Sequence, residues 1–596
     1  MLTLDRLNTC SAAEFVALLD GIYEHSPWVA ERTAARRPFP TLAALKYALQ
    51  QTVRLADADT QLGLIRAHPE LAGQHTAAGT LTAASTEEQA SAGLDGRGSA
   101  DARRDAELEA LRALNAAYRA RFGFPFVIAV KGHDGRGMPR AAIIAALERR
   151  LRAQLADETA ESLRQIGRIA ELRLNQRCGF VPALGAQALA GCDTLAQWSD
   201  TPQGLTCTYL SPSHRRSAEQ IAVWMRAAGM AVHIDAIGNV VGRYGSGNSM
   251  NAGDTKTLLT GSHYDTVVNA GRYDGRAGIL VALAAVEHLH RAGVRLPFHL
   301  EVVAFADEEG VRYGHTLLGS SALAGSFDPS WLNSVDGDGV ALREALRDAG
   351  HDPDAIPALA RPRDDLLGFV EIHIEQGPVL LERGLPLGIV DAIAGSCRYV
   401  LALTGTAGHA GTVPMALRRD AAAAAAEIVL LVERVCRDAA GVVGTVGQLE
   451  VPGGSINVIP GHCRLSLDIR AGDDALRDAA LADILRGIEA ICARRGVSRT
   501  LEPVLRTAAT PCASWLSTQL GKAVARSGLE VVTLPSGAGH DGLALGKITD
   551  IAMLFVRCGN GGISHHPLET VSADDLDLAA TVFVDFLRHF TPAAAL

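Results

Sequence analysis

The chain has 596 residues, too many for one compact core, and at about 150 residues per domain this length predicts roughly three or four domains. Hydrophobic residues make up 48% of the chain and charged residues 20%, which is typical of folded globular proteins and excludes a largely disordered chain. The net charge is -10 and no Lys/Arg stripe with interleaved aromatics occurs, so we expect small-molecule partners and no nucleic acid.

The cysteines and the N-terminal segment bear on the compartment. The ten cysteines are scattered without a CxxC pair, which argues against a zinc knuckle and a disulfide framework and favours a reducing environment. Asp5 and Arg6 interrupt the segment where a signal peptide needs an apolar core, and no stretch reaches about 18 apolar residues. We therefore expect a cytoplasmic protein without a membrane-spanning segment.

The predicted elements divide the chain into three parts. Residues 1–174 are rich in Ala, Leu, Arg and Glu with apolar residues at helical spacing, which predicts an all-α domain. In residues 175–388 and 501–596, β-branched runs alternate with helical segments, so we expect an α/β sheet covered by helices. Residues 389–500 contain strand-like runs around an Ala-rich helix and are predicted to form a small inserted α/β sandwich.

Three motifs in the helical part place polar and apolar side chains at helix ends. A histidine and a glutamate held together on helices can exchange a proton with a bound anion, and an apolar strip can form one wall of a ligand site. Taken singly, a His-Pro dipeptide often only ends a helix, and SxxE is often a capping box. The candidates, in RAHPELAG, STEEQASAGL and FGFPFVIAVKG, are His68, Pro69, Ser85, Glu88, Gln89, Phe126, Val127, Ile128, Ala129 and Val130.

Together these motifs resemble the 2-oxo-4-hydroxy-4-carboxy-5-ureidoimidazoline (OHCU) decarboxylase family over about residues 5–174. The resemblance implies that His68 is the general acid, Glu88 its carboxylate partner and Arg150 an anchor for the substrate carboxylate. Ala153 stands where the family commonly has asparagine, so the choice of Arg150 over Arg149 stays open. No cofactor is expected in this half, because the ureidoimidazoline ring can delocalise the electron pair that decarboxylation leaves.

Imidazole and carboxylate side chains occur in the second half where strand-like runs end. A lone histidine is usually structural, but five such motifs in order predict a metal site. Two ions about 3.5 to 4 Å apart need a bridging carboxylate and about two further ligands each, and these ligand types suit Zn²⁺ or Mn²⁺ without deciding between them. GSHYDTV, GRYDG, FADEEG, VEIHIEQG and GISHHPLE supply His263, Asp265, Asp274, Glu308, Glu309, His373 and His565.

These motifs, in this order, resemble the allantoate amidohydrolase and N-carbamoyl-L-amino acid hydrolase family over about residues 180–592. The resemblance implies a metallopeptidase-like catalytic domain with two divalent metal ions. It implies that the first ion is held by His263 and His373, the second by Glu309 and His565, and both by Asp274. His566, beside the last histidine, stands where the family usually has a small residue, so it is an alternative ligand.

The remaining motif residues are assigned to proton transfer and substrate recognition. Glu308 is surplus to coordination and is the candidate general base, while Asp265 would orient His263. The resemblance places Gln376, His409, Asn457 and Arg470 on the substrate, and Arg470 suits a carboxylate. His540 in SGAGHDG is a further substrate-side candidate. Because several of these lie in the inserted segment, the resemblance implies a lid and a homodimer that shares residues across its interface.

The two resemblances together predict a bifunctional enzyme of purine catabolism. Decarboxylation of OHCU yields (S)-allantoin, a separate allantoinase would form allantoate, and the second half would hydrolyse allantoate to ureidoglycine, ammonia and CO2. The steps are not consecutive, so direct channelling is not implied. Alternatives are an N-carbamoyl-L-amino acid hydrolase, a peptidase, which HIEQG and GRYDG disfavour, and a non-catalytic binding or scaffold protein, against which the retained Glu308 argues.

Overall fold

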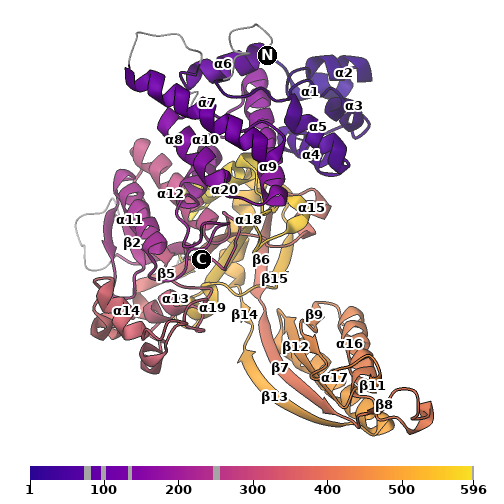
Figure 1. The fold of residues 1–596 in the computed structure, drawn as a ribbon. Helices are drawn as coiled ribbons and strands as arrows, with labels where there is room; N and C mark the ends of the chain where they lie inside the picture. Colours follow the sequence, from indigo (N-terminus) through magenta and orange to yellow (C-terminus); the bar gives the residue numbers. More distant parts are fainter. Residues whose placement is uncertain (40, 73–81, 95–101, 132–136, 246–254, 594–596) are drawn as a thin grey trace.

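The computed structural model describes residues 1–39, 41–72, 82–94, 102–131, 137–245 and 255–593. Figure 1 shows three parts: a helical N-terminal region, a larger α/β body, and a small α/β unit that projects from the body. No described helix is both long and apolar enough to cross a membrane. The ten cysteines are free thiols, as their scattered spacing predicts.

The N-terminal region consists of helices around one apolar core that includes Phe15, Leu45 and Leu111. Its described residues also form one isolated β-bridge, between Lys131 and Gly137. The last helix runs past residue 174 and ends before Gly179, whose φ of 65° forms a left-handed cap. The helices are α1 (Leu4–Thr9), α2 (Ala12–Leu18), α3 (Trp28–Ala34), α4 (Leu42–Arg54), α5 (Ala58–Ala67), α6 (Ala83–Ser91), α7 (Ala102–Phe122), α8 (Arg140–Arg150) and α9 (Leu155–Cys178).

The body is built on a mixed sheet with the strand order β1-β2-β4-β3-β5-β16-β6-β14, and β15 pairs with β6. The central strands β4, β3, β5 and β16 run parallel, and they are almost entirely buried because helices cover both faces. The strands are β1 (Ala231–Ile234), β2 (Val240–Tyr244), β3 (Thr257–His263), β4 (His299–Phe305), β5 (Leu366–Ile374), β6 (Leu387–Ile393), β14 (Thr510–Pro511), β15 (Thr533–Ser536) and β16 (Ile551–Val556).

Neighbouring residues of one strand enter different cores, which shows that the sheet separates two apolar layers. Leu258 of β3 packs in the layer under the long helices, whereas Leu259 packs in the layer under the short ones. The first layer holds α10 (Ala183–Leu195), α11 (Pro212–Ala227), α12 (Arg276–Arg291), α18 (Ser514–Arg526) and α20 (Ala573–His589). The second holds α13 (Leu318–Leu323), α15 (Val379–Arg383) and α19 (Gly542–Leu545), while α14 (Leu342–Asp348) lies in a peripheral segment.

The small unit is a second sheet with two helices on one face. Its strands follow the order β10-β12-β7-β13, with β9 beside β12, and alternate side chains of β12 are buried under the helices. A two-stranded piece, β8 and β11, lies at the far end (Figure 1). The elements are β7 (Gly395–Thr404), β8 (Gly408–His409), α16 (Ala421–Asp438), β9 (Val442–Thr445), β10 (Leu449–Glu450), β11 (Val458–Ile459), β12 (His462–Ala471), α17 (Asp474–Arg495) and β13 (Ser498–Thr507).

Ion pairs join the helical region to the body. Lys46 of α4 pairs with Asp574 of α20 at 2.8 Å, and both side chains are only 5% exposed. Arg272 of the body pairs with Glu161 of α9 at 3.0 Å. Because a buried charge is costly without its partner, the Lys46 pair makes the docking of the two parts specific.

Candidate active sites

The side chains predicted to bind metal meet at the carboxyl edge of the parallel strands. His263 is the last residue of β3, Glu308 and Glu309 follow β4, and His373 lies near the end of β5. His565 lies in the segment that follows β16. Because parallel strands end at the same edge of a sheet, residues more than 300 positions apart, such as His263 and His565, are brought together there.

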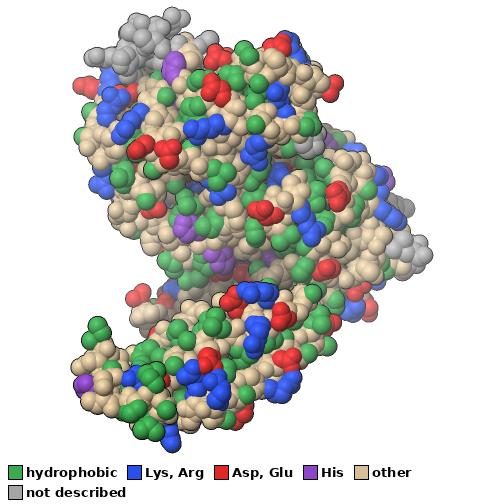
Figure 2. Space-filling model, turned by 90° about the vertical axis from the view of Figure 1, so that its right-hand side faces the viewer, with side chains coloured by type: hydrophobic (Ala, Val, Ile, Leu, Met, Phe, Trp, Pro, Cys, Tyr) green, Lys and Arg blue, Asp and Glu red, His purple; other side chains and the backbone are tan. Residues whose placement is uncertain are grey.

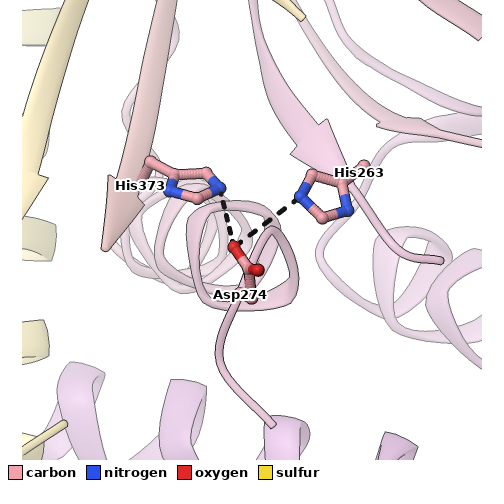
Figure 3. A group of neighbouring side chains, drawn as sticks. All are labelled: His263, Asp274 and His373. Carbon is pink, nitrogen blue, oxygen red and sulfur yellow. Dashed lines mark ion pairs between the residues drawn. The ribbon is translucent and has the colours of Figure 1, made fainter. Parts of the chain in front are cut away.

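Asp274 lies at the centre of this cluster, and each of its carboxylate oxygens faces a different group. Oδ1 is 3.3 Å from Nε2 of His373 and 3.9 Å from Nε2 of His263 (Figure 3). Oδ2 is 2.9 Å from Nε2 of His565, which in turn is 3.3 Å from Oε1 of Glu309. Asp274 is therefore shared by two possible metal-binding groups, one with His263 and His373 and one with Glu309 and His565.

The spacing of these atoms fits divalent cations. A tetrahedral ion with ligands about 2.1 Å away keeps neighbouring ligand atoms about 3.4 Å apart, which is close to the separations around Asp274. Burial would by itself raise the pKa of Asp274, but the hydrogen bond from His565 and the charge of His373 hold it well below the usual range. The carboxylate of Asp274 is therefore anionic. The residues present fit a pair of divalent metal ions.

Asp265 supports the cluster from behind. Its Oδ1 lies 3.4 Å from Nδ1 of His263, so the opposite nitrogen, Nε2, is turned toward Asp274. The same carboxylate accepts hydrogen bonds from the backbone N–H groups of Glu308 and Glu309, at 3.1 and 3.2 Å. One buried aspartate thus orients a histidine and fixes the loop that carries both glutamates, which extends the role expected for it.

Glu308 lies against the cluster without belonging to either group around Asp274. Its carboxylate comes within 4.8 Å of ligand atoms of both His263 and Glu309. Burial, followed by the charge of Glu309, raises the pKa of Glu308 well above its usual value. A carboxyl group in such surroundings can take up and hold a proton.

Two predicted substrate residues of the body are placed close to the cluster. Nε2 of Gln376 donates to both oxygens of Asp274, at 3.0 and 3.1 Å, and the residue has a left-handed φ of 55°. His540 is 1% exposed, lies with its ring centroid 4.4 Å from that of His373, and shares a hydrogen bond of 2.7 Å with Ser536. Gln376 therefore contacts Asp274 itself, and His540 packs behind a predicted ligand.

The predicted substrate residues of the small unit lie at its two opposite ends. Nη1 of Arg470 donates to the backbone oxygen of Gly537 at 2.7 Å, which places it against the loop that carries His540. His409 and Asn457 are exposed at the paired strands β8 and β11, at the far end of the unit. Figure 2 shows a hollow between the small unit and the rest of the molecule, with histidine side chains beside it. Within one chain, only Arg470 of these three lies next to the body.

Glu569 was not singled out in the sequence, although it links two loops of the cluster. It is 1% exposed, and its Oε1 accepts from the backbone N–H groups of Tyr273 and Asp274 at 2.8 and 3.2 Å. Its Oε2 accepts from the hydroxyl of Ser564, next to His565, at 2.7 Å. Its position four residues after His565 in SHHPLE was the available signal.

The helical region contains a second polar cluster, centred on Arg173 of α9. Its guanidinium donates to Glu88 at 2.8 Å, to Glu24 at 2.8 Å and to the hydroxyl of Ser85 at 3.0 Å. A cavity of about 320 Å³ opens beside it, lined by Glu88, Arg173, Ala129 and Val130 among others. Two residues of the expected site, Ser85 and Glu88, therefore contact an arginine that was not predicted, and Ala129 and Val130 line the same cavity.

His68 is buried near this cluster, with 6% of its surface exposed. Its Nδ1 shares a hydrogen bond of 3.1 Å with the backbone oxygen of Leu64. Burial lowers its pKa to about 4, and the charge of Arg173 acts in the same direction. The imidazole is therefore neutral at neutral pH. Since a carbonyl oxygen can only accept, Nδ1 carries the proton that it donates to Leu64, and Nε2 keeps a free lone pair.

The structure places Arg150 elsewhere. Its guanidinium donates to Glu158 at 2.8 Å, to the backbone oxygen of Val127 at 2.7 Å and to Ser162 at 3.1 Å. Arg173 and Glu24 were missed, although one signal was available. Arg173 falls on the apolar face of its helix, seven residues after Ile166, and a charge at such a position calls for a buried partner.

The rest of the predicted apolar strip is mostly in the core. Phe126 and Val127 are 1% and 4% exposed, and Ile128 packs against the same core. Gln89 accepts from the backbone N–H of Ala72 at 3.3 Å, whereas its Nε2 has no hydrogen-bond partner among the described residues. Pro69 is half-buried directly after His68.

Comparison with known proteins agrees with this architecture. Allantoate deiminase 1 of Glycine max is 39% identical over 444 residues, which cover 69% of this chain and 91% of that protein. N-carbamoyl-L-amino acid amidohydrolase of Geobacillus stearothermophilus is 40% identical over 379 residues, which cover 64% and 91%. The crystal structure of an amidase of the hydantoinase/carbamoylase family from Burkholderia multivorans aligns with a TM-score of 0.64 and 31% identity, and covers 69% of this chain and 98% of that one.

The fold and the cluster around Asp274 define a metal-dependent hydrolase, attached to a helical region of a different family. Residues 259–589, more than half of the chain, match the peptidase family M20/M25/M40, and residues 8–175 match OHCU decarboxylase. The chain belongs to the peptidase family M20/M25/M40 and carries an OHCU decarboxylase region at its N-terminal side. The predicted fusion of a lyase region with a hydrolase region is confirmed.

Proposed function

We propose that the protein catalyses two reactions of purine catabolism. The helical region decarboxylates OHCU to (S)-allantoin, and the body hydrolyses allantoate to ureidoglycine, ammonia and CO2. The observation that carries the hydrolase assignment is the position of Asp274 between two groups of metal-binding side chains. The choice of allantoate rests on the fusion with an OHCU decarboxylase region and on relatives named allantoate deiminase.

The hydrolytic reaction would use Asp274 with His263, His373, Glu309 and His565 to hold two divalent cations, zinc or manganese. When bound, such ions polarise the scissile amide and make a water nucleophilic at neutral pH. Glu308 would take the proton of that water and deliver it to the leaving nitrogen. Arg470 would bind the substrate carboxylate, which would have to replace the present bidentate pair of its Nε and Nη2 with Asp468, at 3.1 and 2.8 Å.

A homodimer would complete the substrate site. His409 and Asn457 are exposed, on or beside β8 and β11 at the far end of the small unit, and a partner subunit would bring them to the cluster. Exposed apolar side chains on the small unit, including Leu430 at 63% and Val504 at 63%, are suited to such an interface. The domain limits expected from the sequence were 1–174, 175–388 with 501–596, and 389–500 for the dimerisation and lid domain. Strand pairing supports moving these limits to 1–178, 179–394 with 508–596, and 395–507, because β6 (Leu387–Ile393) pairs in the body sheet and β13 (Ser498–Thr507) in the small one. The proposed location is the cytoplasm.

The decarboxylase reaction would take place beside Arg173. The guanidinium lines the cavity with its donors bonded to Glu88, Glu24, Ser85 and the backbone oxygen of Gly21, so an anionic substrate would have to displace one of these acceptors. The negative charge of the substrate would also raise the pKa of the neutral His68. His68 would then take up a proton and deliver it to the carbon that loses CO2. Glu88, held by Arg173 at 2.8 Å, would orient the substrate ureide, and no cofactor is needed.

One alternative for the body has specific support. A carbamoylase of Geobacillus stearothermophilus is as similar to this chain as the allantoate deiminases are. Its name identifies N-carbamoyl-L-amino acids as the competing substrate class. Both substrates carry a carboxylate and a carbamoyl nitrogen, so the cluster around Asp274 suits either.

A substrate panel tests the hydrolase assignment. The chain is stripped with a chelator, reloaded with zinc or with manganese, and assayed with allantoate, several N-carbamoyl-L-amino acids and ureidoglycolate. We expect kcat/KM for allantoate to exceed the others by at least about tenfold, a difference of roughly 1.4 kcal/mol in transition-state binding. If a carbamoyl amino acid is hydrolysed with the higher kcat/KM, that compound class replaces allantoate as the assigned substrate. If none of the compounds is hydrolysed with either metal, the hydrolase assignment is overturned.

Paired arginine substitutions test the decarboxylase site. Arg173→Lys keeps the charge but loses bidentate binding, so we expect decarboxylation to fall by about a hundredfold while allantoate hydrolysis is unchanged. The conservative Arg150→Lys should lower thermal stability, because Arg150 is bonded to Glu158, but should largely spare kcat. The reverse pattern would return the anchoring role to Arg150.

A further inference from the structure

The cavity beside Arg173 is bounded on one side by residues that follow the helical region. Residues 179–182, here called the connecting segment, join α9 to α10. They lie beyond residue 175, where the match to OHCU decarboxylase ends. All four nevertheless line the cavity of about 320 Å³, together with Glu88 and Arg173. The part of the chain that matches the decarboxylase family therefore does not supply the whole lining.

The connecting segment gives this cavity an exposed apolar wall. Phe180 is 39% exposed and Val181 57%, and both side chains line the cavity. The charged groups of the lining are already engaged, because Lys131 pairs with Glu87 and Arg173 with Glu88. Apolar surface that lines a cavity is removed from water when a ligand fills the space, which favours binding. The apolar wall can therefore contact a ligand without giving up a present partner.

Phe180 is held in place from two directions. Helix α9 ends at Gly179, whose φ is 65°, and the backbone N–H of Phe180 donates to the backbone oxygen of Asn175 at 3.0 Å. Nζ of Lys46 lies 5.1 Å from the centre of the Phe180 ring, within the range of a cation–π contact. The same Nζ pairs with Asp574 of α20. The ion pair between the helical region and the body thus lies against the ring.

The body also fixes the other end of the connecting segment. The backbone N–H groups of Leu184 and Gly185, in the first turn of α10, donate to Oδ1 of Asp577 in α20 at 2.9 and 3.1 Å. Groups at a helix start lack partners within their own helix, so this carboxylate takes that place. A Cβ on Gly185 would lie 1.9 Å from the backbone oxygen of Ala573, which shows how closely α10 packs on α20. The position of the apolar wall is therefore set by the body.

We propose that Phe180 and Val181 are substrate-binding residues of the decarboxylase site, held in place by the body. The inference rests on the proposed decarboxylation of OHCU and adds to it a wall that lies outside the matched decarboxylase region. The ring of the substrate packs against Phe180 and Val181, and the polar groups of the substrate are left to Glu88, Arg173 and His68. The decarboxylase site is then complete only where the body is attached.

Opposite charges at position 181 test the proposal on the full, metal-loaded chain. Val181 is 57% exposed, so Val181→Asp and Val181→Lys should both fold. Because OHCU carries a carboxylate, we expect KM for OHCU to be at least about fivefold higher in Val181→Asp than in Val181→Lys, with similar kcat. Val223→Asp and Val223→Lys are the matched controls, since Val223 is 53% exposed on α11 and does not line the cavity. Equal KM values in the two Val181 variants would overturn the proposal.

Two substitutions of Phe180 test the contact with the substrate ring. We expect Phe180→Ala to raise KM for OHCU about tenfold with little change in kcat, because the lost contact is made in the ground state and the transition state alike. Phe180→Tyr keeps the ring and should bring KM back to within about twofold of the wild type. Melting curves and allantoate hydrolysis report on the fold of each variant. A fall in kcat at unchanged KM in Phe180→Ala would overturn a role in substrate binding.

Failure of this inference is distinguishable from failure of the proposed function. If the wild-type chain forms no (S)-allantoin from OHCU, the proposed decarboxylation and the inference are both overturned. If the wild type is active and the variants at positions 180 and 181 keep its KM, the inference alone is overturned.

Discussion

At the scale of single residues, the geometry of the cluster around Asp274 depends on which neighbour each polar atom of a side chain contacts. His263 uses one ring nitrogen toward Asp265 and the other toward Asp274, so its orientation is determined before any ion binds. Glu308 is held near the cluster by its backbone N–H bond to Asp265, which leaves its carboxylate uncommitted. These contacts support the proposal that His263 is a metal ligand and Glu308 a proton carrier, although the carboxylate of Glu308 also lies within 4.8 Å of ligand atoms of His263 and Glu309.

This difference predicts the effect of Glu308→Gln. We expect turnover of allantoate to fall by about 10²- to 10⁴-fold, because the amide cannot take up a proton, while the bound metal stays near the wild-type content. Elemental analysis alongside kcat checks both. Glu309→Gln is the matched substitution, and it should lose metal as well as activity. Loss of metal in the Glu308 variant would mean that Glu308 is a ligand.

The buried His68 predicts a pH dependence of stability. Its pKa in the folded chain is about 4, below the value of about 6.5 expected in the unfolded chain, so unfolding takes up a proton between these values. The contribution of His68 to the free energy of unfolding is fully present above about pH 6.5. It is lost as the pH drops toward 4, by on the order of 3 kcal/mol. Melting curves of the wild type and of His68→Gln should therefore converge toward low pH, and parallel curves would contradict the lowered pKa.

At the scale of elements, the ends of parallel strands and the start of one helix place the cluster. Helix α12 begins directly after Asp274 and Gly275, and Gly275 has a φ of 63°. A Cβ at this position would lie 2.4 Å from the backbone oxygen of His263 and 2.5 Å from its ring. The turn thus requires a residue without a side chain, both for its conformation and for the close approach of β3.

Gly275→Ala should therefore displace His263. Gly293→Ala is a matched control, because Gly293 ends the same helix region with a φ of 66° but has nothing within 4 Å of the added Cβ. We expect both variants to lose roughly 1 to 3 kcal/mol of stability from backbone strain, and only the Gly275 variant to lose metal affinity and hydrolysis. Metal titration separates the two, and equal metal affinity in both would refute a steric role.

At the scale of the whole molecule, the helical region and the body are joined by buried ion pairs as well as by the continuous chain. Lys46 and Asp574 are 528 positions apart and meet in a site with almost no solvent. Burial and the charge of Asp574 raise the pKa of nearby Glu171 to about 7. The contact between the two parts is therefore sensitive to any change in this group of charges.

Removing one partner should weaken the docking of the two parts. Lys46→Met leaves the buried Asp574 unpaired, and we expect a loss of about 3 to 5 kcal/mol with earlier proteolysis between the parts. Arg343→Met breaks the exposed pair with Asp354 and should cost less than about 1 kcal/mol. Denaturation and limited proteolysis compare the two variants. Equal losses in the free energy of unfolding would show that the buried pair contributes no more to stability than the exposed one.

Much of the molecule was determined by the sequence alone. The helical periodicity of the first part, the alternation that follows, and the ordered motifs around His263, Asp274 and His373 predicted the fusion and the metal-dependent hydrolase. Such features are local, since periodicity and strand-end motifs extend over a few residues. The same reasoning predicted which histidines and carboxylates would be candidates. The structure brings His263, Asp274, Glu309, His373 and His565 together, whereas His409 is exposed on β8 of the small unit.

Tertiary structure decided which distant residues became partners. Arg173 lies 149 positions from Glu24 and 85 from Glu88, and no local pattern indicates that these residues, rather than Arg150, share one cluster. The cavity of about 780 Å³ between the helical region and the body likewise exists only because α9 packs against the body. Pairings of this kind depend on how whole helices and sheets pack, because buried charges take the partners that packing brings within hydrogen-bond distance.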